Sequence, residues 1–319
     1  MQIAQAAPGA RILGMGHHQP ANEVTNADLI ARGVETTDEW IQSRVGIAAR
    51  RIALADESVV DMAEAAASKA IAASGVDVSD IDLVIVATCT MQTSVPNAAA
   101  QLATRLGISS PGAFDVNAAC AGFVYATAQA NAAVVTGQAR NVLVVGSEKL
   151  STYTDPDDRS TNIIFADGAG AAVIGRTDEP GLGPVVWGSD GSHATTIEIP
   201  TGGQYIVQEG QTVFRWATGQ LAPVALEACR RAGVDPSEIA AFIPHQANLR
   251  IIEAIAKKVG AANAVIARDI VNAGNTSAAS IPLAMSRMVE RGEIPSGAPV
   301  LIIGFGAGLT FASQVVLAP

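Results

Sequence analysis

The stretch Val142-Leu143-Val144-Val145 returns 158 residues later as Val300-Leu301-Ile302-Ile303. Each stretch is a continuous apolar run with the length of a buried β-strand, and Leu83–Ala87 is a third run of this kind. Val116-Asn117-Ala118 recurs at a similar offset, 155 residues, as Val271-Asn272-Ala273. These nearly constant offsets indicate that the chain contains two homologous halves.

Ala-rich stretches alternate with the apolar runs. Asp61–Ser74 and Leu249–Val259 are predicted helices, and each is followed by a glycine suited to end it, Gly75 and Gly260. Alternation of strands and helices predicts an α/β fold. A Gly- and Pro-rich segment at 175–185 is the predicted junction of the halves, which divides the chain into residues 1–175 and 176–319. We expect the halves to form one rigid body with the functional site between them.

The composition excludes several classes of protein. Of the 319 residues, 49% are hydrophobic, so a large core can form. The net charge of −10 disfavours nucleic acid as a partner. Three cysteines without CxxC spacing predict neither a disulfide framework nor a zinc site. Met1–Pro8 lacks the pattern of a secretory signal, and no apolar run approaches the roughly 18 residues of a membrane span, so we expect a cytoplasmic protein without a membrane partner.

Cys120 is a candidate nucleophile. It opens an apolar stretch that is predicted to continue as a helix to about Gly137. A helix N-terminus stabilises a thiolate through free N–H groups and the positive end of the dipole, so we expect this thiol to be more acidic than a free cysteine. Its Ala and Gly neighbours leave room for a substrate carbonyl. A buried structural cysteine is the alternative interpretation of the same local sequence.

His245 and Asn275 are candidate hydrogen-bond donors to an oxygen that gains negative charge. His245 follows the strand Ala241–Pro244, at the sheet edge where α/β proteins usually bind ligands. Asn275 precedes an Ala-rich helix. A core histidine and a helix N-cap are the alternatives. The 155-residue offset would place Cys120 and Asn275 at equivalent positions of the two halves, which favours a shared site for acyl transfer through a thioester.

Two further segments have more than one interpretation. Gly304–Gly308 follows the last long strand and could donate backbone N–H groups to an oxyanion, or could be a Gly-rich bend without a catalytic role. It lacks the Lys-Ser/Thr of a phosphate-binding loop. The helix Leu249–Val259 carries Arg250, Lys257 and Lys258 away from its core-spaced residues. This stripe is either a dock for an acidic partner or a solvated helix face.

Four stretches together resemble one family. They are ACAGF at 119–123, PHQANLRI at 244–251, GNTSAAS at 274–280 and GFGAG at 304–308. All are similar to stretches of β-ketoacyl-acyl-carrier-protein synthase III, the initiating condensing enzyme of type II fatty acid synthesis. The resemblance covers nearly the whole chain. It implies the thiolase fold, in which two α/β halves form five αβαβα layers, and a homodimer.

The resemblance implies that Cys120, His245 and Asn275 are the catalytic residues. Cys120 would take the acyl group from an acyl-CoA. Malonyl-acyl-carrier-protein would then lose CO2, while His245 and Asn275 stabilise the enolate, which attacks the acyl-cysteine to give a 3-oxoacyl-carrier-protein. The N–H groups of Cys120 and Gly306 would form the oxyanion hole. No metal or other cofactor is required, because the CoA thioester is a substrate.

The resemblance also implies a CoA site. Trp40 and Arg159 would sandwich the adenine, since both side chains stack on a base. Thr36 and Arg44 would lie beside the nucleotide, and Asn248 beside the pantetheine arm.

A carrier-protein patch and an acyl pocket follow from the same resemblance. The basic residues that match the patch are Arg215, Arg250, Lys257 and Lys258. Val95 stands where members that use acetyl-CoA carry a Phe at the end of the acyl pocket, so a smaller wall suggests room for branched or longer primers.

Two alternatives remain open from the sequence. One is a related starter condensing enzyme or acyltransferase of a secondary, polyketide-type pathway that uses the same Cys-His-Asn site. The other is a non-catalytic subunit that binds the carrier protein, which the intact Cys120, His245 and Asn275 disfavour. Thiolases proper use a second cysteine near the C-terminus, and here no cysteine follows Cys229.

Overall fold

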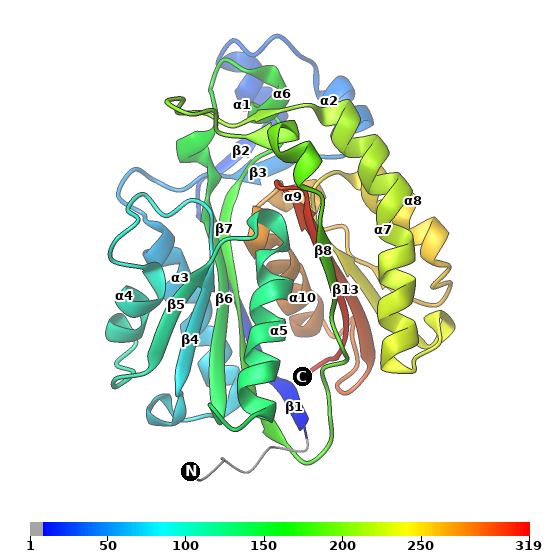
Figure 1. Ribbon diagram of the computed structural model, residues 1–319. Coiled ribbons are helices and arrows are strands. Elements are labelled where there is room, and N and C mark those ends of the chain that lie inside the picture. The colour runs from blue at the N-terminus through cyan, green and yellow to red at the C-terminus, as the bar shows by residue number, and fades with distance from the viewer. Residues whose placement is uncertain (1–8) are drawn as a thin grey trace.

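The computed structural model describes residues 9–319 and contains two five-stranded sheets with matching topology (Figure 1). The predicted absence of a secretory signal concerns Met1–Pro8, which lies outside the described residues. The first sheet has the order β5-β4-β6-β7-β1 and the second β12-β11-β13-β14-β8. In each sheet the first three strands are parallel and the remaining pairs are antiparallel. The equivalence of the two halves, read from the repeated apolar runs, therefore extends to whole sheets.

The strand bounds preserve the 158-residue offset. β4 and β11 begin at Leu83 and Ala241, and β6 and β13 begin at Asn141 and Pro299 (241 − 83 and 299 − 141 are both 158). The first sheet comprises β1 (Gly9–His18), β4 (Leu83–Ala87), β5 (Gly112–Val116), β6 (Asn141–Lys149) and β7 (Asp167–Thr177). The second comprises β8 (Val186–Ser189), β11 (Ala241–Pro244), β12 (Val265–Ile266), β13 (Pro299–Gly306) and β14 (Thr310–Leu317).

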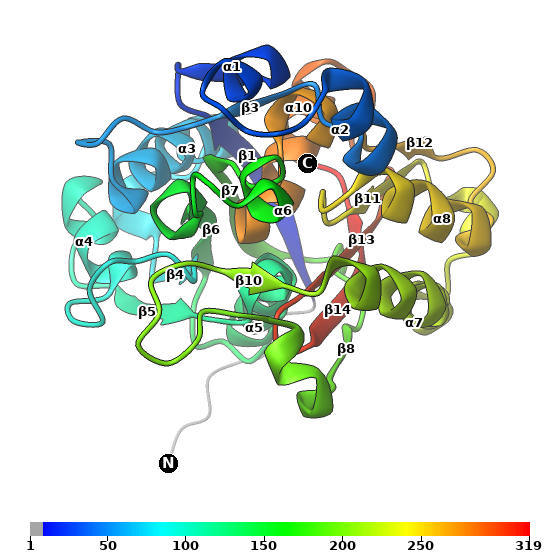
Figure 2. The ribbon, with the colours of Figure 1, turned by 90° about the horizontal axis from the view of Figure 1, so that it is seen from above.

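Helices cover both faces of each sheet and give five layers (Figures 1 and 2). The outer face of the first sheet carries α3 (Val59–Ser74) and α4 (Ala98–Arg105). The central layer is formed by α5 (Gly122–Val135) and α10 (Ser280–Glu290). The outer face of the second sheet carries α7 (Gly210–Ala232) and α8 (Leu249–Val259). The predicted five-layer α/β fold is confirmed.

The repeated apolar run forms a strand in each half because both faces of each sheet are buried. In β6, Val142 and Val144 pack into the central layer, while Leu143 and Val145 pack under α3 and α4. β13 alternates in the same way. Successive side chains of a strand point to opposite faces, so a strand covered on both sides needs an unbroken apolar sequence.

Helix ends follow the expected chemistry. α8 has the predicted bounds, is capped by Asn248 and ends at Gly260, whose φ is 72°. α3 also ends as predicted, at Gly75, but begins at Val59, two residues before the predicted start. The reason is a capping box between Ser58 and Asp61, which satisfies backbone donors of the first turn.

Smaller elements form a cap above one end of the sheets, at the top of Figure 1. They are β2 (Glu23–Thr25), α1 (Asn26–Ala31), α2 (Asp38–Val45), β3 (Ala49–Arg51), α6 (Arg159–Asn162), β9 (Ile197–Glu198), β10 (Val207–Gln208) and α9 (Ile270–Ala273). β7 ends at Thr177, two residues beyond the predicted boundary between the halves. The division of the chain into residues 1–175 and 176–319 stays a prediction. Between residues 9 and 319, no helix combines the length and apolar character needed to cross a membrane.

Candidate active site

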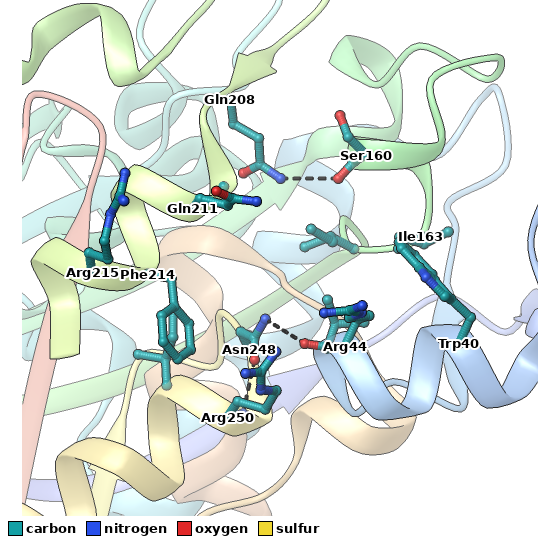
Figure 3. Close-up of a pocket in the computed structure, with 14 residues that line it drawn as sticks. Trp40, Arg44, Ser160, Ile163, Gln208, Gln211, Phe214, Arg215, Asn248 and Arg250 are labelled. Atoms are coloured by element: carbon teal, nitrogen blue, oxygen red, sulfur yellow. Dashed lines mark hydrogen bonds between the residues drawn. The ribbon is translucent and has the colours of Figure 1, made fainter.

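The site consists of a large outer cleft that opens into a small inner cavity. The outer cleft has a volume of about 680 Å³ and lies between α2, α7 and the start of α8 (Figure 3). The inner cavity has a volume of about 80 Å³ and is lined by Cys120, His245 and Asn275, together with Phe305 and Gly306. The residues that line both spaces are Ile164, Gln208, Gly210, Asn248 and Ile251. The three candidate catalytic residues therefore face one cavity that is continuous with the cleft.

Cys120 lies in the 3₁₀ turn Ala119–Ala121, directly before α5. Burial of the thiol raises its pKa to about 12; a hydrogen bond with Ser277 opposes this rise, and the Glu148 carboxylate adds to it. The prediction of an unusually acidic thiol is therefore wrong. The desolvation cost of a buried thiolate exceeds the stabilisation that the helix start provides.

Gly306, at the end of β13, lies against Cys120. A Cβ atom at this position would stand 2.7 Å from the backbone nitrogen of Cys120 and 3.2 Å from its Sγ. Gly304 has the same relation to Ala121, with a Cβ–Cα distance of 2.8 Å. Only glycine lets the strand end so close to the nucleophile, which brings the backbone of Gly306 beside that of Cys120.

His245 follows β11 and is only 2% exposed. Its Nδ1 lies 2.7 Å from the Oγ of Ser280, which also accepts a hydrogen bond from the backbone N–H of Gln246. We assign the Ser280 proton to Nδ1, which leaves the imidazole proton on Nε2. The edge-to-face ring contact with Phe305, at 5.2 Å, fixes the plane of the imidazole. Burial lowers the pKa of His245 to about 3, so the ring is neutral and can donate from Nε2.

We expect His245 to remain neutral from pH 8 down to pH 5. An unfolded histidine takes up a proton near pH 6.5, so the unfolded state binds more protons than the folded state below that pH. The folded state then loses up to about 1.4 kcal/mol of stability per pH unit between pH 6.5 and pH 3 through this group. NMR of the chain's four labelled histidines will identify His245 as the signal lost in His245→Asn. A midpoint near 6.5 for that signal would contradict the assignment.

Asn275 is 5% exposed, and its amide is oriented by the backbone. Its Oδ1 accepts a hydrogen bond of 2.9 Å from the N–H of Ser277. Its backbone is held between Ile164 and Ala166 by two further bonds of 2.9 Å. With the oxygen engaged, the Nδ2 group remains as a donor toward the cavity. Asn275 is not the N-cap of α10, which is Ala279.

The prediction that Cys120 and Asn275 are equivalent residues is wrong. The turns Ala119–Ala121 and Ser277–Ala279 precede α5 and α10 at the conserved offset of 158 (277 − 119). Ala119 and Ser277 have matching φ values, 45° and 48°, and each donates its N–H to the asparagine two residues earlier. Asn275 therefore corresponds to Asn117, and Cys120 to Ala278. The Val-Asn-Ala match is misleading because its first copy lies at the end of strand β5 and its second copy lies in helix α9.

Three residues of the site were not assigned from the sequence: Glu148, Ser277 and Ser280. Ser277 and Ser280 belong to the GNTSAAS stretch, but neither was given a role. Glu148 lies in β6 next to its last residue and is 0% exposed. The sequence feature that could have indicated Glu148 is a carboxylate at the C-terminal end of a buried strand, where α/β proteins often place functional residues.

The predicted CoA-binding residues are only partly brought together. Trp40, Arg44 and Asn248 line the outer cleft, whereas Thr36 and Arg159 do not. The Arg159 guanidinium stacks on the Trp40 ring, with its Cζ 4.7 Å from the ring centroid. An adenine between Trp40 and Arg159 would therefore have to displace this guanidinium. Asn248 caps α8 and donates a hydrogen bond of 3.1 Å to the Arg44 carbonyl oxygen.

The predicted basic patch lies partly at the cleft and partly along α8. Arg215 and Arg250 line the cleft from α7 and α8, and Arg250 lies over the Phe214 ring (Figure 3). Lys257 and Lys258 are exposed farther along α8. The stripe is not purely basic, because Glu253 on the same helix is exposed and pairs with Arg268 at 2.7 Å.

Val95 does not line the inner cavity of its own chain, and its place at the end of the acyl pocket stays a prediction. It is 83% exposed, in the loop between β4 and α4, and it is absent from the lining of the inner cavity. Its size therefore does not set the volume of the cavity beside Cys120. Among residues 9–319, the structure has no group of three His, Cys, Asp or Glu side chains arranged to hold a metal ion.

Family models match the two parts of the chain that carry the three candidate catalytic residues. The model described as 3-oxoacyl-[acyl-carrier-protein (ACP)] synthase III matches residues 114–191, which include Cys120. The model described as the C-terminal part of the same enzyme matches residues 229–317, which include His245 and Asn275.

Known relatives match over nearly their whole length. The chain is 53% identical to β-ketoacyl-[acyl-carrier-protein] synthase III 2 of Streptomyces avermitilis, over 98% of this chain and 99% of that protein. Its structure is similar to that of the priming β-ketosynthase of the R1128 polyketide biosynthetic pathway, with a TM-score of 0.97, 42% identity and coverage of 100% and 98%. It is also similar to 3-oxoacyl-[acyl-carrier-protein] synthase III of Aquifex aeolicus, with a TM-score of 0.92, 38% identity and coverage of 97% and 100%.

Proposed function

Since the chain belongs to the β-ketoacyl-[acyl-carrier-protein] synthase III family of condensing acyltransferases, we propose that it joins an acyl-CoA primer to malonyl-acyl-carrier-protein. The products are a 3-oxoacyl-carrier-protein, CoA and CO2, and the reaction initiates fatty acid biosynthesis. One observation carries the proposal: a single cavity holds a cysteine nucleophile together with a neutral imidazole and an amide, each free to donate one hydrogen bond.

The reaction has two stages. In the first, the Sγ of Cys120 attacks the thioester carbonyl, CoA leaves, and the acyl group remains on the enzyme. We propose that the N–H groups of Cys120 and Gly306 bind the carbonyl oxygen, which the close approach of their backbones supports.

In the second stage, the malonyl group loses CO2 and its thioester carbonyl becomes an enolate. Nε2 of His245 and Nδ2 of Asn275 donate to this oxygen. The enolate carbon then attacks the acyl-cysteine, and the thiolate leaves. Loss of CO2 makes the condensation effectively irreversible, and the proposal requires no resident metal or other cofactor.

A turnover assay tests this function. Purified protein, malonyl-carrier-protein and a panel of straight, branched and long acyl-CoAs should yield CO2 and free CoA in equal amounts. CO2 release without a 3-oxoacyl product from any primer would contradict the proposal.

A second candidate, a starter condensing enzyme of a polyketide-type pathway, is favoured by the similarity to the R1128 priming β-ketosynthase. It shares the chemistry and differs in the primer and the carrier protein. In the same assay, the primer preference and a comparison of carrier proteins from the two kinds of pathway decide between the candidates.

We propose that the outer cleft binds CoA through Trp40, Arg44 and Asn248. Arg159 and Thr36 would join the site only if Arg159 leaves the face of Trp40 to admit the adenine. The size of the cleft and its continuity with the inner cavity support this placement. We propose a cytoplasmic location, where CoA thioesters and carrier-protein substrates would be available together.

We propose that the basic patch of Arg215, Arg250, Lys257 and Lys258 binds the acidic carrier protein, and Lys257→Glu tests this role. We expect the KM for malonyl-carrier-protein to rise about fivefold to tenfold at low salt, because a favourable contact becomes repulsive, and the difference to shrink at high salt. Arg176→Glu is the control. It is an equal charge change on an exposed residue next to the C-terminal end of β7, outside the lining of the cleft. A larger rise in KM for Lys257→Glu than for Arg176→Glu supports the patch, whereas an equal or smaller rise contradicts it.

A homodimer is proposed on the basis of the first sheet's open edge. β5 is an edge strand, and Phe114 on it is 40% exposed; Val95, in the loop between β4 and α4, is also exposed. An edge strand with exposed apolar side chains is suited to pairing with a second copy. Sedimentation of the purified protein measures whether its mass is twice 32.5 kDa.

A further inference from the structure

Glu148 is a buried carboxylate that lies outside the inner cavity. It has no exposed surface and does not line the cavity. The groups that donate hydrogen bonds to its two oxygens are the hydroxyls of Thr88, Thr90 and Ser277, at 3.1, 2.5 and 3.0 Å, and the N–H and S–H of Cys89, at 3.1 and 3.4 Å. The hydroxyls of Thr88 and Thr90 each accept a backbone N–H, which leaves their protons for Glu148. A carboxylate surrounded by donors forms strong bonds and fixes the groups around it.

Ser277 connects Glu148 to Asn275. Its hydroxyl donates to Oε1 of Glu148 at 3.0 Å, and its N–H donates to Oδ1 of Asn275 at 2.9 Å. Ser277 is 1% exposed and does not line the inner cavity. Its φ is 48°, an unfavourable value for a residue with a side chain. A strained residue persists only where its surroundings hold it, and the bond to Glu148 provides such a hold.

The first half of the chain contains the same turn without this anchor. Ala119 is the equivalent of Ser277 and has a φ of 45°, but it has no hydroxyl. Its N–H lies 3.3 Å from Oδ1 of Asn117, whereas the corresponding distance in the second half is 2.9 Å. Asn117 is exposed and does not line the inner cavity, whereas Asn275 is buried and does. The turn thus holds its asparagine more closely in the half that has the anchor.

The strand ends that support the two turns differ at one equivalent position. β6 contacts the turn before α10, and β13 contacts the turn before α5. Gly146 of β6 corresponds to Gly304 of β13 (304 − 146 is 158), and a Cβ atom at either glycine would stand within 2.8 Å of the backbone of its turn. Two residues later, β13 has Gly306 beside the nucleophile, whereas β6 has Glu148 beside Ser277. The carboxylate is therefore specific to the half that carries the amide donor.

We propose that Glu148 and Ser277 position Asn275 for decarboxylation of the malonyl group. Glu148 holds the Ser277 hydroxyl, and the N–H of Ser277 then holds Oδ1 of Asn275, so that Nδ2 is directed to the enolate oxygen. This inference rests on the proposed function, because Asn275 acts in the second stage of that reaction. Neither Glu148 nor Ser277 faces the cavity, so both are positioning residues that act through Asn275.

Ser277→Ala tests the anchor directly. Ala119 occupies the equivalent position at a similar φ, so we expect this variant to fold. The protein is first acylated to completion, and release of labelled CO2 from malonyl-carrier-protein is then followed, so that the rate of loading does not enter. We expect CO2 release to be about tenfold slower than in wild type. The loss is smaller than the 10²- to 10³-fold cost of removing a donor, because the Asn275 amide is still present but less well oriented.

The double variant shows whether Ser277 acts through Asn275. If it does, Ser277→Ala should slow CO2 release by less than about twofold in the Asn275→Ala background, because the group that it orients is already gone. A tenfold loss in both backgrounds would mean that Ser277 acts independently of Asn275, and would overturn the proposal. CO2 release at the wild-type rate from Ser277→Ala alone would also overturn it.

Glu148→Gln tests the carboxylate. The hydroxyls of Thr88 and Thr90 and the N–H of Cys89 all donate to Oε2, so the single oxygen of the amide is expected to take that place. Its NH2 group then faces the Ser277 hydroxyl, whose proton loses its acceptor. We expect CO2 release to slow about tenfold, with no further loss when Glu148→Gln is combined with Ser277→Ala.

A purely electrostatic role of Glu148 gives the opposite sign. Removing a negative charge near the site favours formation of the negatively charged enolate, so Glu148→Gln would release CO2 as fast as wild type or faster. That result overturns the proposal. If one of the variants Ser277→Ala and Glu148→Gln does not fold, the other decides.

Ser151→Ala is the matched control for loss of a serine–carboxylate bond. The Ser151 hydroxyl donates at 2.6 Å to Asp167, which is also 0% exposed, but neither residue lines the inner cavity. We expect this variant to release CO2 at the wild-type rate per folded molecule. A loss equal to that of Ser277→Ala would mean that any such bond supports the step through the fold alone, and would overturn the proposal.

Hydrogen exchange measured by NMR tests the anchor without a substrate. The backbone N–H of residue 277 is bonded to Asn275 and should exchange at least about tenfold faster in Ser277→Ala and Glu148→Gln than in wild type. Exchange at the wild-type rate in both variants would overturn the proposal. If wild type releases no CO2 from malonyl-carrier-protein, the proposed function fails, while the exchange rates still decide whether Glu148 and Ser277 hold Asn275.

Discussion

Replacing Cys120 with alanine will abolish acylation of the protein. Cys120 faces the inner cavity, and its sulfur is the only protein atom in our mechanism that forms a bond to the primer. Loss of a catalytic nucleophile typically lowers turnover by a factor on the order of 10⁴ or more. Intact mass after mixing with an acyl-CoA should rise by one acyl group in wild type and remain unchanged in Cys120→Ala.

Cys229→Ala provides the control for this experiment. Cys229 is 1% exposed and lies in α7, within the core outside the second sheet, where it contacts neither cavity. This variant should acquire the acyl group as wild type does. An equal mass increase in Cys120→Ala would show that another residue carries the primer and would contradict the assignment.

Asn275→Ala and His245→Ala will separate the two stages of the reaction. Each variant should still be acylated, because neither residue takes the thiol proton in our mechanism. Each should release CO2 from malonyl-carrier-protein about 10² to 10³ times more slowly, because the enolate oxygen loses one of two oriented donors. Trapping of labelled CO2 measures this step, and intact mass measures acylation in the same samples.

Asn272→Ala is the control for Asn275→Ala. Asn272 is exposed and lies three residues earlier, outside the inner cavity. We expect its CO2 release to equal that of wild type. Normal CO2 release from Asn275→Ala and His245→Ala would remove the role assigned to both side chains, whereas loss of acylation in these variants would move them to the first stage.

The fold could be predicted from the sequence because its main elements are defined by local patterns. An unbroken apolar run such as Val142–Val145 is required wherever both faces of a strand are covered. α8 combines an asparagine cap, core spacing and a terminal glycine, and it has the predicted bounds. The 158-residue offset then links the two halves, since an insertion within a repeated unit would have changed it.

The details of the site depend on contacts between distant segments, and these the sequence does not reveal. The helix start at Cys120 predicts an acidic thiol, but burial and Glu148, from another element, have the opposite effect on its pKa. The Val-Asn-Ala match predicts the wrong partner for Asn275, because three residues can recur in a strand end and in a helix. The family resemblance places Val95 at the acyl pocket, but a single chain leaves it on the surface.

The shared passage between the outer cleft and the inner cavity has a kinetic consequence. The inner cavity is less than an eighth of the volume of the cleft (80 Å³ against 680 Å³), and both are reached past the same residues, among them Asn248 and Ile251. If CoA and the carrier protein both reach Cys120 through this passage, as we propose, one pantetheine arm must withdraw before the next can enter. We then expect double-displacement kinetics, in which free CoA competes with malonyl-carrier-protein for the acyl-enzyme. Accumulated CoA would slow the second half of the cycle without any separate regulatory site.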